Sequence, residues 1–410
     1  MENLLFELND ALLEQNGELV VEVLNEDYFY ETFFDENDEE KEQMPDEILL
    51  KKFVNQCIGN VSNRAFILNY YNALLYFYGQ EDYKNSFKSM NQAVSDFISH
   101  IYDKEANDVW TVPIMKFLAS ALNKYGMKAM KVSESEETSS DEEGPLEQAA
   151  RVLQRAFSVS TADRSDLSVS KKWGALHIVN VLLRIYFQLN KLGLCTKLIQ
   201  NVTESRSLPD LEIFPVAQRV TYRFFSGRVA ILQSKLQKAK DDLEYALVYC
   251  HESATHNKKM ILRYLACVNL MLGKYPTESL CKKYGMDEFL EISKACRSGD
   301  LRNYKRNLEK HMKFFIEQGT YLMLEKIKVI VYRNLLRRVC SISAQNARLS
   351  IDLFRVALNF VEDEPVDMDE TEAILSNLIY SGYLKGYMSH EKQILVLSKV
   401  CAFPPLNQVV

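Results

Sequence analysis

The chain has 410 residues, of which 47% are hydrophobic and 26% charged, as in an ordinary soluble globular protein with a sizeable core. Only 14 Gly and 9 Pro occur, which disfavours a many-turned β architecture and favours long helices. The formal net charge is −7 at pH 7, so any basic surface must be local rather than general.

The sequence also limits which targeting signals and which cysteine chemistry are expected. The longest apolar stretches are interrupted by Lys, Arg or Asn, so no membrane insertion is expected. Residues 1–10 hold three acids and no base, unlike a secretory signal. The eight cysteines lie far apart and form no CxxC pair. We therefore expect reduced thiols in a cytosolic or nuclear protein.

Residues 1–130 are predicted to form N-terminal helical repeats. Residues 1–34 show a helical pattern with a polar break at 25–27, and the acidic segment 35–47 holds eight acids against one Lys, which predicts a solvated loop. From 48 onward, apolar faces recur in helix–turn–helix pairs like those of tetratricopeptide arrays, although the strict repeat signature is absent.

Residues 131–145 interrupt this pattern with an acidic, serine-rich segment that ends in Gly-Pro. It contains six acids and no base from Ser133 onward, cannot bury apolar area, and is predicted to be a disordered insert. Ser139 and Ser140 each have a Glu three residues later, so acid-directed phosphorylation is an alternative to a plain inserted loop.

Residues 146–340 return to paired amphipathic helices, and residues 341–410 change period. A helical stripe at Ile374, Leu375, Leu378 and Ile379 ends at Gly382, after which two short strands are predicted at 383–388 and 393–398. A helix that feeds a small β-hairpin is the second half of a winged helix. The predicted fold is therefore all-α, a helical-repeat solenoid that ends in a winged-helix subdomain.

Basic residues are concentrated shortly before and within this last subdomain. Residues 302–355 hold twelve Lys/Arg against four Asp/Glu. Such a face could neutralise phosphates of RNA or double-stranded DNA with little sequence preference, although ordinary solvated positions or partner salt bridges are the alternative. The acids of the helix that starts at 367 would repel a DNA groove, which disfavours base readout. The candidate nucleic-acid contacts are Arg333, Arg337, Arg338, Arg348, Arg355, Lys385, His390 and Lys392.

The apolar edge of the winged half is the candidate partner interface, because tyrosines are favoured at such surfaces. The alternative is that these residues fill the core of the small subdomain. They are Leu378, Ile379, Tyr380, Tyr383 and Tyr387.

No pattern in the sequence points to catalysis. His251 and His256 lie five residues apart, which places them about 140° apart on a helix and does not suit a zinc pair. No Gly-rich phosphate loop precedes a strand. We expect a non-enzymatic protein with no catalytic residues, no metal site and no cofactor.

Several blocks resemble one branch of the PCI family over residues 146–406, namely PCI domain-containing protein two. This branch includes the PCI subunit of the TREX-type, transcription-coupled mRNA-export complex and the signalosome subunit-twelve-like proteins. The blocks are Ser170–Gly174 with Asn180 and Ile185–Phe187, Asn190–Leu192 with Leu194 and Cys195, Ala217–Tyr222, Asn257–Leu262, Glu325–Lys328 with Tyr332–Leu335, and Phe403–Leu406.

The resemblance implies a scaffold and nucleic-acid-binding subunit that couples transcription to mRNA export. It implies a location in the nucleus, including nuclear pores, with some cytoplasmic protein. The implied partners are a large PCI-type mRNA-export scaffold protein and a small acidic disordered subunit shared with the proteasome lid. Basic residues near two of the blocks are candidate contacts for the acidic subunit: Lys171, Lys172, Lys258, Lys259 and Arg263.

Two alternatives remain at this point. The first is a signalosome-associated PCI subunit that acts only in protein assembly, for which the basic face would have no role. The second is a sequence-specific transcription factor, which the acidic recognition helix disfavours.

Overall fold

The computed structural model describes residues 1–34, 45–104, 109–135, 143–205, 207–343 and 347–409. The chain divides into two compact units, Met1–Phe225 and Ser226–Val410. The boundary lies inside one helix, whereas the predicted boundaries at 130, 145 and 340 followed changes of composition. Helices run through 130 and 340 without a break.

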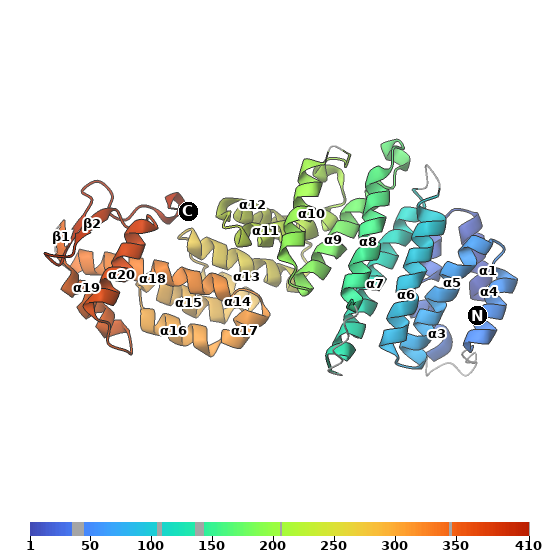
Figure 1. The fold of residues 1–410 in the computed structure, drawn as a ribbon, viewed down its shortest axis with the longest axis horizontal. Helices are drawn as coiled ribbons and strands as arrows, with labels where there is room; N and C mark the ends of the chain where they lie inside the picture. Colours follow the sequence, from blue (N-terminus) through green and yellow to red (C-terminus); the bar gives the residue numbers. More distant parts are fainter. Residues whose placement is uncertain (35–44, 105–108, 136–142, 206, 344–346, 410) are drawn as a thin grey trace. The chain divides into compact units, whose positions relative to one another are not determined.

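The N-terminal unit is built from consecutive helices that pack against their neighbours in sequence (Figure 1). The α-helices are α1 (Glu2–Leu13), α2 (Gly17–Val23), α3 (Glu26–Phe34), α4 (Glu47–Cys57), α5 (Val61–Leu74), α6 (Tyr83–Phe97), α7 (Thr111–Ser135), α8 (Pro145–Ala162), α9 (Lys172–Gln188) and α10 (Leu192–Glu204). Two π-helical turns, Leu75–Gly79 and Ile98–Tyr102, extend α5 and α6. The helix–turn–helix pairs predicted from residue 48 onward are confirmed.

The start of the chain has one more break than the sequence pattern suggested. Gln15 takes a left-handed φ of 53°, and the Asn16 side chain accepts a hydrogen bond from the Leu19 backbone N–H at 3.2 Å. This is the geometry of a helix N-cap, so α1 ends and α2 begins here. The prediction of a break only at 25–27 was therefore incomplete.

The two acidic segments lie largely outside the described residues, namely at 35–44 and 136–142. Their flanks are helical, which corrects the predicted limits. Asp46 caps α4 by accepting from the Leu49 N–H at 2.7 Å, so Glu47 already belongs to a helix. The helix α7 continues to Ser135, and Pro145 opens α8, a position where proline's missing N–H costs nothing.

The C-terminal unit begins in α11 (Val216–Leu232) and continues as a helical array. Further helices are α12 (Leu236–Tyr249), α13 (Thr255–Met271), α14 (Glu278–Tyr284), α15 (Asp287–Ser298), α16 (Leu301–Lys310), α17 (Met312–Glu317) and α18 (Tyr321–Ile342). Short breaks separate α14 from α15 and α16 from α17. Gly285 takes a left-handed φ of 57° and ends α14, and His311 separates α16 from α17.

The winged half follows α18 and consists of β1 (Arg348–Ser350), α19 (Ile351–Val361), α20 (Met368–Tyr380), β2 (Gly386–Ser389) and β3 (Ile394–Leu397). The strands form an antiparallel sheet in the order β1-β3-β2, with Leu349 opposite Leu395 and Met388 opposite Leu395 on the other side. The predicted hairpin is confirmed, and β1 adds a third strand that the sequence analysis missed. The fold is a helical-repeat solenoid with a winged-helix end.

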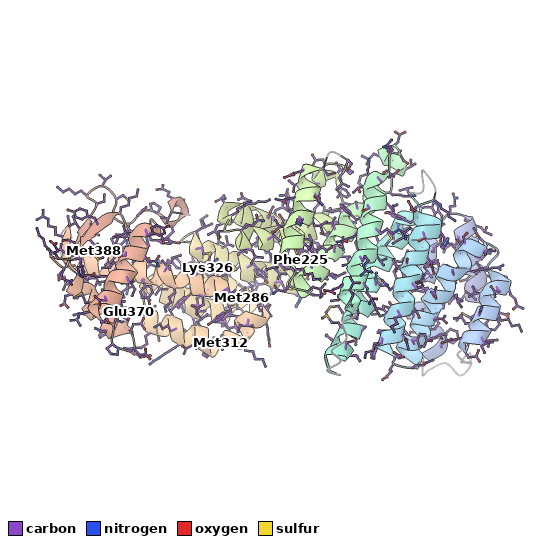
Figure 2. All side chains as sticks on the ribbon, in the orientation of Figure 1. Phe225, Met286, Met312, Lys326, Glu370 and Met388 are labelled. Atoms are coloured by element: carbon purple, nitrogen blue, oxygen red, sulfur yellow. The ribbon has the colours of Figure 1, made fainter. Side chains whose placement is uncertain are left out.

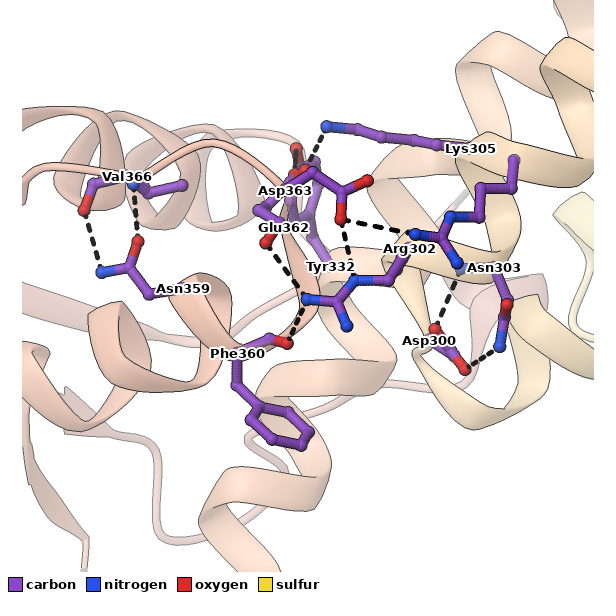
Figure 3. A network of polar contacts seen from close by, with 11 residues as sticks. Asp300, Arg302, Asn303, Lys305, Tyr332, Asn359, Phe360, Glu362, Asp363 and Val366 are labelled. Atoms are coloured by element: carbon purple, nitrogen blue, oxygen red, sulfur yellow. Dashed lines mark hydrogen bonds and ion pairs between the residues drawn. The ribbon is translucent and has the colours of Figure 1, made fainter.

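A polar network fixes the connection between α19 and α20 to the preceding helices (Figure 3). Arg302 on α16 donates to the Phe360 carbonyl at 2.9 Å and lies 3.1 Å from the Asp363 carboxylate. The Lys305 ammonium bonds the buried Glu362 carboxylate, which also accepts from Tyr332 on α18 at 3.4 Å. We call Arg302, Lys305, Tyr332, Glu362 and Asp363 the α16 clamp.

None of the helices in the described ranges has both the length and the apolarity needed to cross a membrane.

Candidate nucleic-acid and partner interface

The structure removes Arg333 from the predicted phosphate-binding face. This side chain is only 4% exposed, and its guanidinium donates to the Pro404 carbonyl at 2.7 Å. Burial lowers the pKa of Arg333, and the neighbouring charge of Arg337 lowers it further. Because the guanidinium is buried, it does not present its donors to a phosphate at the surface.

Two more predicted contacts are already engaged with carboxylates. Arg355 is bound to Asp352 on the preceding turn of α19 at 2.7 Å. His390, in the turn between β2 and β3, contacts Glu372 on α20 at 2.7 Å, and this hydrogen bond raises the pKa of the histidine. Both pairs are at the surface, where such contacts contribute little to stability but do offset the local positive charge.

The remaining five candidates are exposed to solvent and stay available for phosphate contact. Arg337 and Arg338 lie near the end of α18, Arg348 opens β1, and Lys385 and Lys392 flank the strands of the wing. Figure 2 shows Met388 on β2 and Glu370 at the acidic start of α20 in the same subdomain. Whether the five cations act together on one ligand remains a prediction.

The predicted partner residues separate into core and surface. Leu378 is 1% exposed and fills the subdomain core, so its assignment to an interface was wrong. Tyr380 and Tyr387 are 93% and 63% exposed, whereas Ile379 and Tyr383 are half-buried. The tyrosine at the end of α20 therefore presents almost its whole ring to solvent, as an interface anchor would.

A second apolar surface on α19 was missed by the sequence analysis. Leu353, Val356 and Phe360 recur at helical spacing and are 46%, 55% and 78% exposed. The opposite face is buried through Ile351, Phe354 and Leu358. In Figure 3 the Phe360 ring points away from the α16 clamp. We call Leu353, Val356 and Phe360 the α19 stripe.

A signal for the α19 stripe was present in the sequence. Of the eleven residues in α19, only Asp352, Arg355 and Asn359 are polar, so the apolar residues exceed one helical face. A helix that is apolar on both sides needs cover on both sides. The sequence analysis did not assign this surplus to any surface, because the sequence alone does not say how many neighbours surround the helix.

The candidate contacts for an acidic partner are more internal than predicted. Lys171 is 4% exposed, and its ammonium donates to the Tyr102 carbonyl, so it supports the helix packing instead of a surface. Arg263 donates to the Gln318 side chain and lies over the Phe314 ring at 4.9 Å. These two assignments are corrected. Lys172, Lys258 and Lys259 are partly exposed.

The Ser-Lys-Lys-Trp block that carried the resemblance is a structural motif. The Asp163 carboxylate accepts from the Ser170 hydroxyl at 2.6 Å and from the Lys171 backbone N–H at 2.7 Å. These hydrogen bonds pull the pKa of Asp163 far below its usual range despite partial burial, which acts in the opposite direction. Asn180 donates to the Gln218 carbonyl at 2.9 Å and thereby links α9 to α11.

The described ranges contain no candidate metal site, because no group of three His, Cys, Asp or Glu side chains converges there. Seven of the eight cysteine thiols are buried, and burial raises the pKa of Cys296 to about 12 and that of Cys340 to about 11. Such thiols remain protonated and unreactive near neutral pH.

Comparison with known proteins now identifies the family. Residues 308–399 match the PCI domain. The chain is 39% identical to PCI domain-containing protein 2 of Xenopus laevis over 86% of its own length and 83% of the relative. It belongs to the PCI domain-containing protein 2 family.

Other relatives show how broad this family is. The homologue from Dictyostelium discoideum is 38% identical over 79% of this chain and 75% of its own length. A protein of Gibberella zeae named Protein CSN12 homolog is 28% identical over 82% of each chain. The matched PCI domain extends from the end of α16 past β3, so it contains Tyr332, Glu362 and Asp363 of the α16 clamp, the α19 stripe and the five exposed cations.

Proposed function

We propose that this protein is a non-enzymatic scaffold subunit that docks a partner through the α19 stripe. The observation that carries the proposal is the pattern of exposure on α19, where three large apolar residues face solvent within a matched PCI domain. Exposed apolar groups that are contiguous and bordered by polar residues are typical of protein interaction sites. Membership of a PCI-domain family supports an assembly role in place of catalysis.

The proposed setting is a nuclear complex that couples transcription to mRNA export at nuclear pores, with part of the protein in the cytoplasm. In it, a large PCI-type scaffold covers the α19 stripe together with Tyr380 and Tyr387. A small acidic disordered subunit contacts Lys258 and Lys259. RNA or double-stranded DNA binds without strong sequence preference to Arg337, Arg338, Arg348, Lys385 and Lys392, because these contacts would be to phosphates.

The second candidate is a signalosome-associated subunit that acts only in protein assembly. The similarity to the protein named Protein CSN12 homolog favours this reading. Both candidates require the α19 stripe, but only the export function requires the basic residues. The two can therefore be separated by changing one surface at a time.

The docking surface is tested with tagged full-length protein recovered from nuclear extract at moderate salt, with quantitative mass spectrometry of what remains bound. Leu353→Ser with Phe360→Ser should remove the large scaffold, since two exposed apolar anchors that the partner would cover are lost. The matched control is Leu322→Ser, which changes a 75% exposed leucine on α18. Retention of every partner by the double variant would contradict the docking proposal.

The same purification separates the two candidates by composition. A large export scaffold, a small acidic subunit and pore proteins would support the export function, whereas signalosome subunits would support the alternative.

The nucleic-acid surface is tested by Arg337→Glu with Arg338→Glu in the recovered complex. We expect affinity for RNA or DNA to fall by about tenfold or more at low salt, and the salt dependence to become shallower, because two phosphate contacts are lost. Lys235→Glu with Lys238→Glu, two exposed lysines at the start of α12, is the charge-matched control. Unchanged affinity of the arginine variant would assign the basic face to another role.

A further inference from the structure

The end of the chain returns across the C-terminal unit as an extended segment. Residues 401–409, which we call the C-terminal strap, contain no helix or strand apart from the short 3-10 turn Leu406–Gln408. The Ala402 carbonyl accepts from the Lys385 backbone N–H at 2.8 Å, just before β2. The strap is therefore held by groups from other elements rather than by its own secondary structure, as a bound peptide would be.

The first anchor is Pro404, whose carbonyl accepts from the guanidinium of Arg333. Proline has no backbone N–H, so its carbonyl is the one main-chain group that it can present to a receptor. The Arg333 guanidinium also lies over the Phe403 ring, 5.8 Å from its centre. Pro404 is itself buried. One buried arginine thus contacts two consecutive strap residues, of which Pro404 is also buried.

The second anchor is Leu406, which is 7% exposed and packs against Gly273 in the turn after α13. Gly273 takes a left-handed φ of 79°, and a methyl group placed on it would lie 3.1 Å from the Leu406 side chain. Glycine is therefore needed both for the backbone conformation and for the close approach of the leucine. A turn of the helical array and the strap form a contact that fits a single aliphatic side chain.

These contacts form a receptor of defined chemistry. It has an arginine donor for a proline carbonyl, a surface for the preceding aromatic ring, and a glycine-walled site for a leucine two residues after that proline. The features match the sequence Phe403-Pro-Pro-Leu406, one of the blocks on which the family resemblance rested.

We propose that Arg333, Gly273 and the Lys385 backbone form a peptide-binding site for an extended aromatic-Pro-Pro-aliphatic segment, which the C-terminal strap occupies in cis and can vacate. Release of the strap would free the Arg333 donors next to Arg337. The proposal concerns the chain alone and does not depend on the proposed function.

The test uses the full-length chain with Phe403→Ala and Leu406→Ala, which weaken the strap but leave the receptor residues intact. The probe is a fluorescently labelled synthetic peptide of residues 399–410, with binding followed by fluorescence anisotropy. The variant should bind it about tenfold or more tightly than wild type, because in wild type the site is filled and only the open fraction can bind. A peptide with Leu406→Ala should lose about tenfold in affinity.

The receptor is tested in the same background. Arg333→Met should abolish peptide binding, whereas Arg338→Met, an exposed arginine on the same helix, should not change it. The proposal is overturned if the strap variant keeps the helical circular dichroism of wild type and fails to bind the peptide. It is also overturned if both peptides bind equally.

A measurement on the wild-type chain keeps the proposal testable should the strap variant not fold. The amides of residues 406–409 should exchange with deuterium through local opening, faster than amides in the middle of α18. Exchange of both sets at one common rate would show that the strap leaves only when the C-terminal unit unfolds, which would overturn release.

Discussion

Helices α9 and α19 have similar composition and opposite environments. Each is apolar on more than one side. In α9 almost every such residue is buried, from Ala175 to Tyr186, because α7, α8 and α10 surround the helix. In α19 only one side is covered, by α18, α20 and β1, and the α19 stripe faces solvent.

The difference shows that a helix with apolar residues on all sides needs packing neighbours on all sides. The sequence does not say whether those neighbours come from the same chain or from a partner. The N-terminal unit supplies the cover for α9 from its own helices. Among the described residues, nothing equivalent lies over the α19 stripe. An uncovered second face on a helix with a well-packed first face is therefore a better indicator of a partner than exposure of single residues.

The largest effect expected from this comparison is in α9. Leu182 is fully buried, and Leu182→Ala should lower the free energy of unfolding by about 2–5 kcal/mol. Val356→Ala in the α19 stripe should change it by about 0.5 kcal/mol or less, because its methyl groups already contact water. Urea unfolding measures the free energy of unfolding of both variants. Intrinsic tryptophan fluorescence follows the α9 variant, since both tryptophans lie in the N-terminal unit, and circular dichroism follows the α19 variant. Equal losses would show that the stripe is covered within the chain.

An intermediate effect is expected at the α16 clamp, which holds the covered side of α19. Lys305→Met removes the cation next to the buried Glu362 and should cost about 1–3 kcal/mol, the penalty of a buried group left without its partner. Arg306→Met removes only an exposed pair with Asp363 at 3.7 Å and should cost less than about 0.5 kcal/mol. Hydrogen exchange of α19 and the segment that follows gives the comparison. If hydrogen exchange became faster by the same amount in both variants, the Lys305–Glu362 pair would stabilise α19 no more than the exposed Arg306–Asp363 pair does.

The last effects depend on pH and have opposite signs in the two regions. His177 on α9 is partly buried, which lowers its pKa to about 4 from 6.5, with smaller contributions from Lys116 and Arg184. Its neutral form is favoured in the folded state, so this contribution to stability is present above pH 6.5 and is lost as the pH falls toward 4. His390 has its pKa raised by Glu372, so its contribution is present below 6.5 and is lost as the pH rises through the raised value.

Proton NMR titration of the two imidazole rings measures these shifts. His177→Gln should flatten the decline of stability between pH 6.5 and 4, whereas His390→Gln should leave that decline unchanged. A decline that is identical in the His177 variant would place its origin in other groups.

The sequence was sufficient for elements with strong local signals. Asp367 caps α20 by accepting from the Glu370 N–H at 2.8 Å, acids fill its first turn, and the left-handed Gly382 follows its end. Each signal acts within a few residues of the feature it determines. The winged end and the helical pairs could be predicted for this reason.

The features that escaped prediction depend on residues far away in the chain. Arg333 was assigned to the surface because its helical spacing matches that of exposed neighbours, and only the returning Pro404, 71 residues later, buries it. The strand β1 is three residues long and exists through its pairing with β3. Lys171 is internal because Tyr102, 69 residues earlier, offers its carbonyl. A sequence pattern that spans only a few residues does not indicate contacts between residues so far apart in the chain.

The position of Cys401 at the start of the C-terminal strap has a consequence for the chemical reactivity of the whole protein. All other cysteines are buried, and Cys401 is half-exposed. Because alkylating reagents attack accessible thiolates, the first equivalent of a maleimide should be incorporated at this residue. A single native thiol thus serves as a built-in reporter group. Its rate of modification reports how firmly the C-terminal strap is bound, without any engineered label.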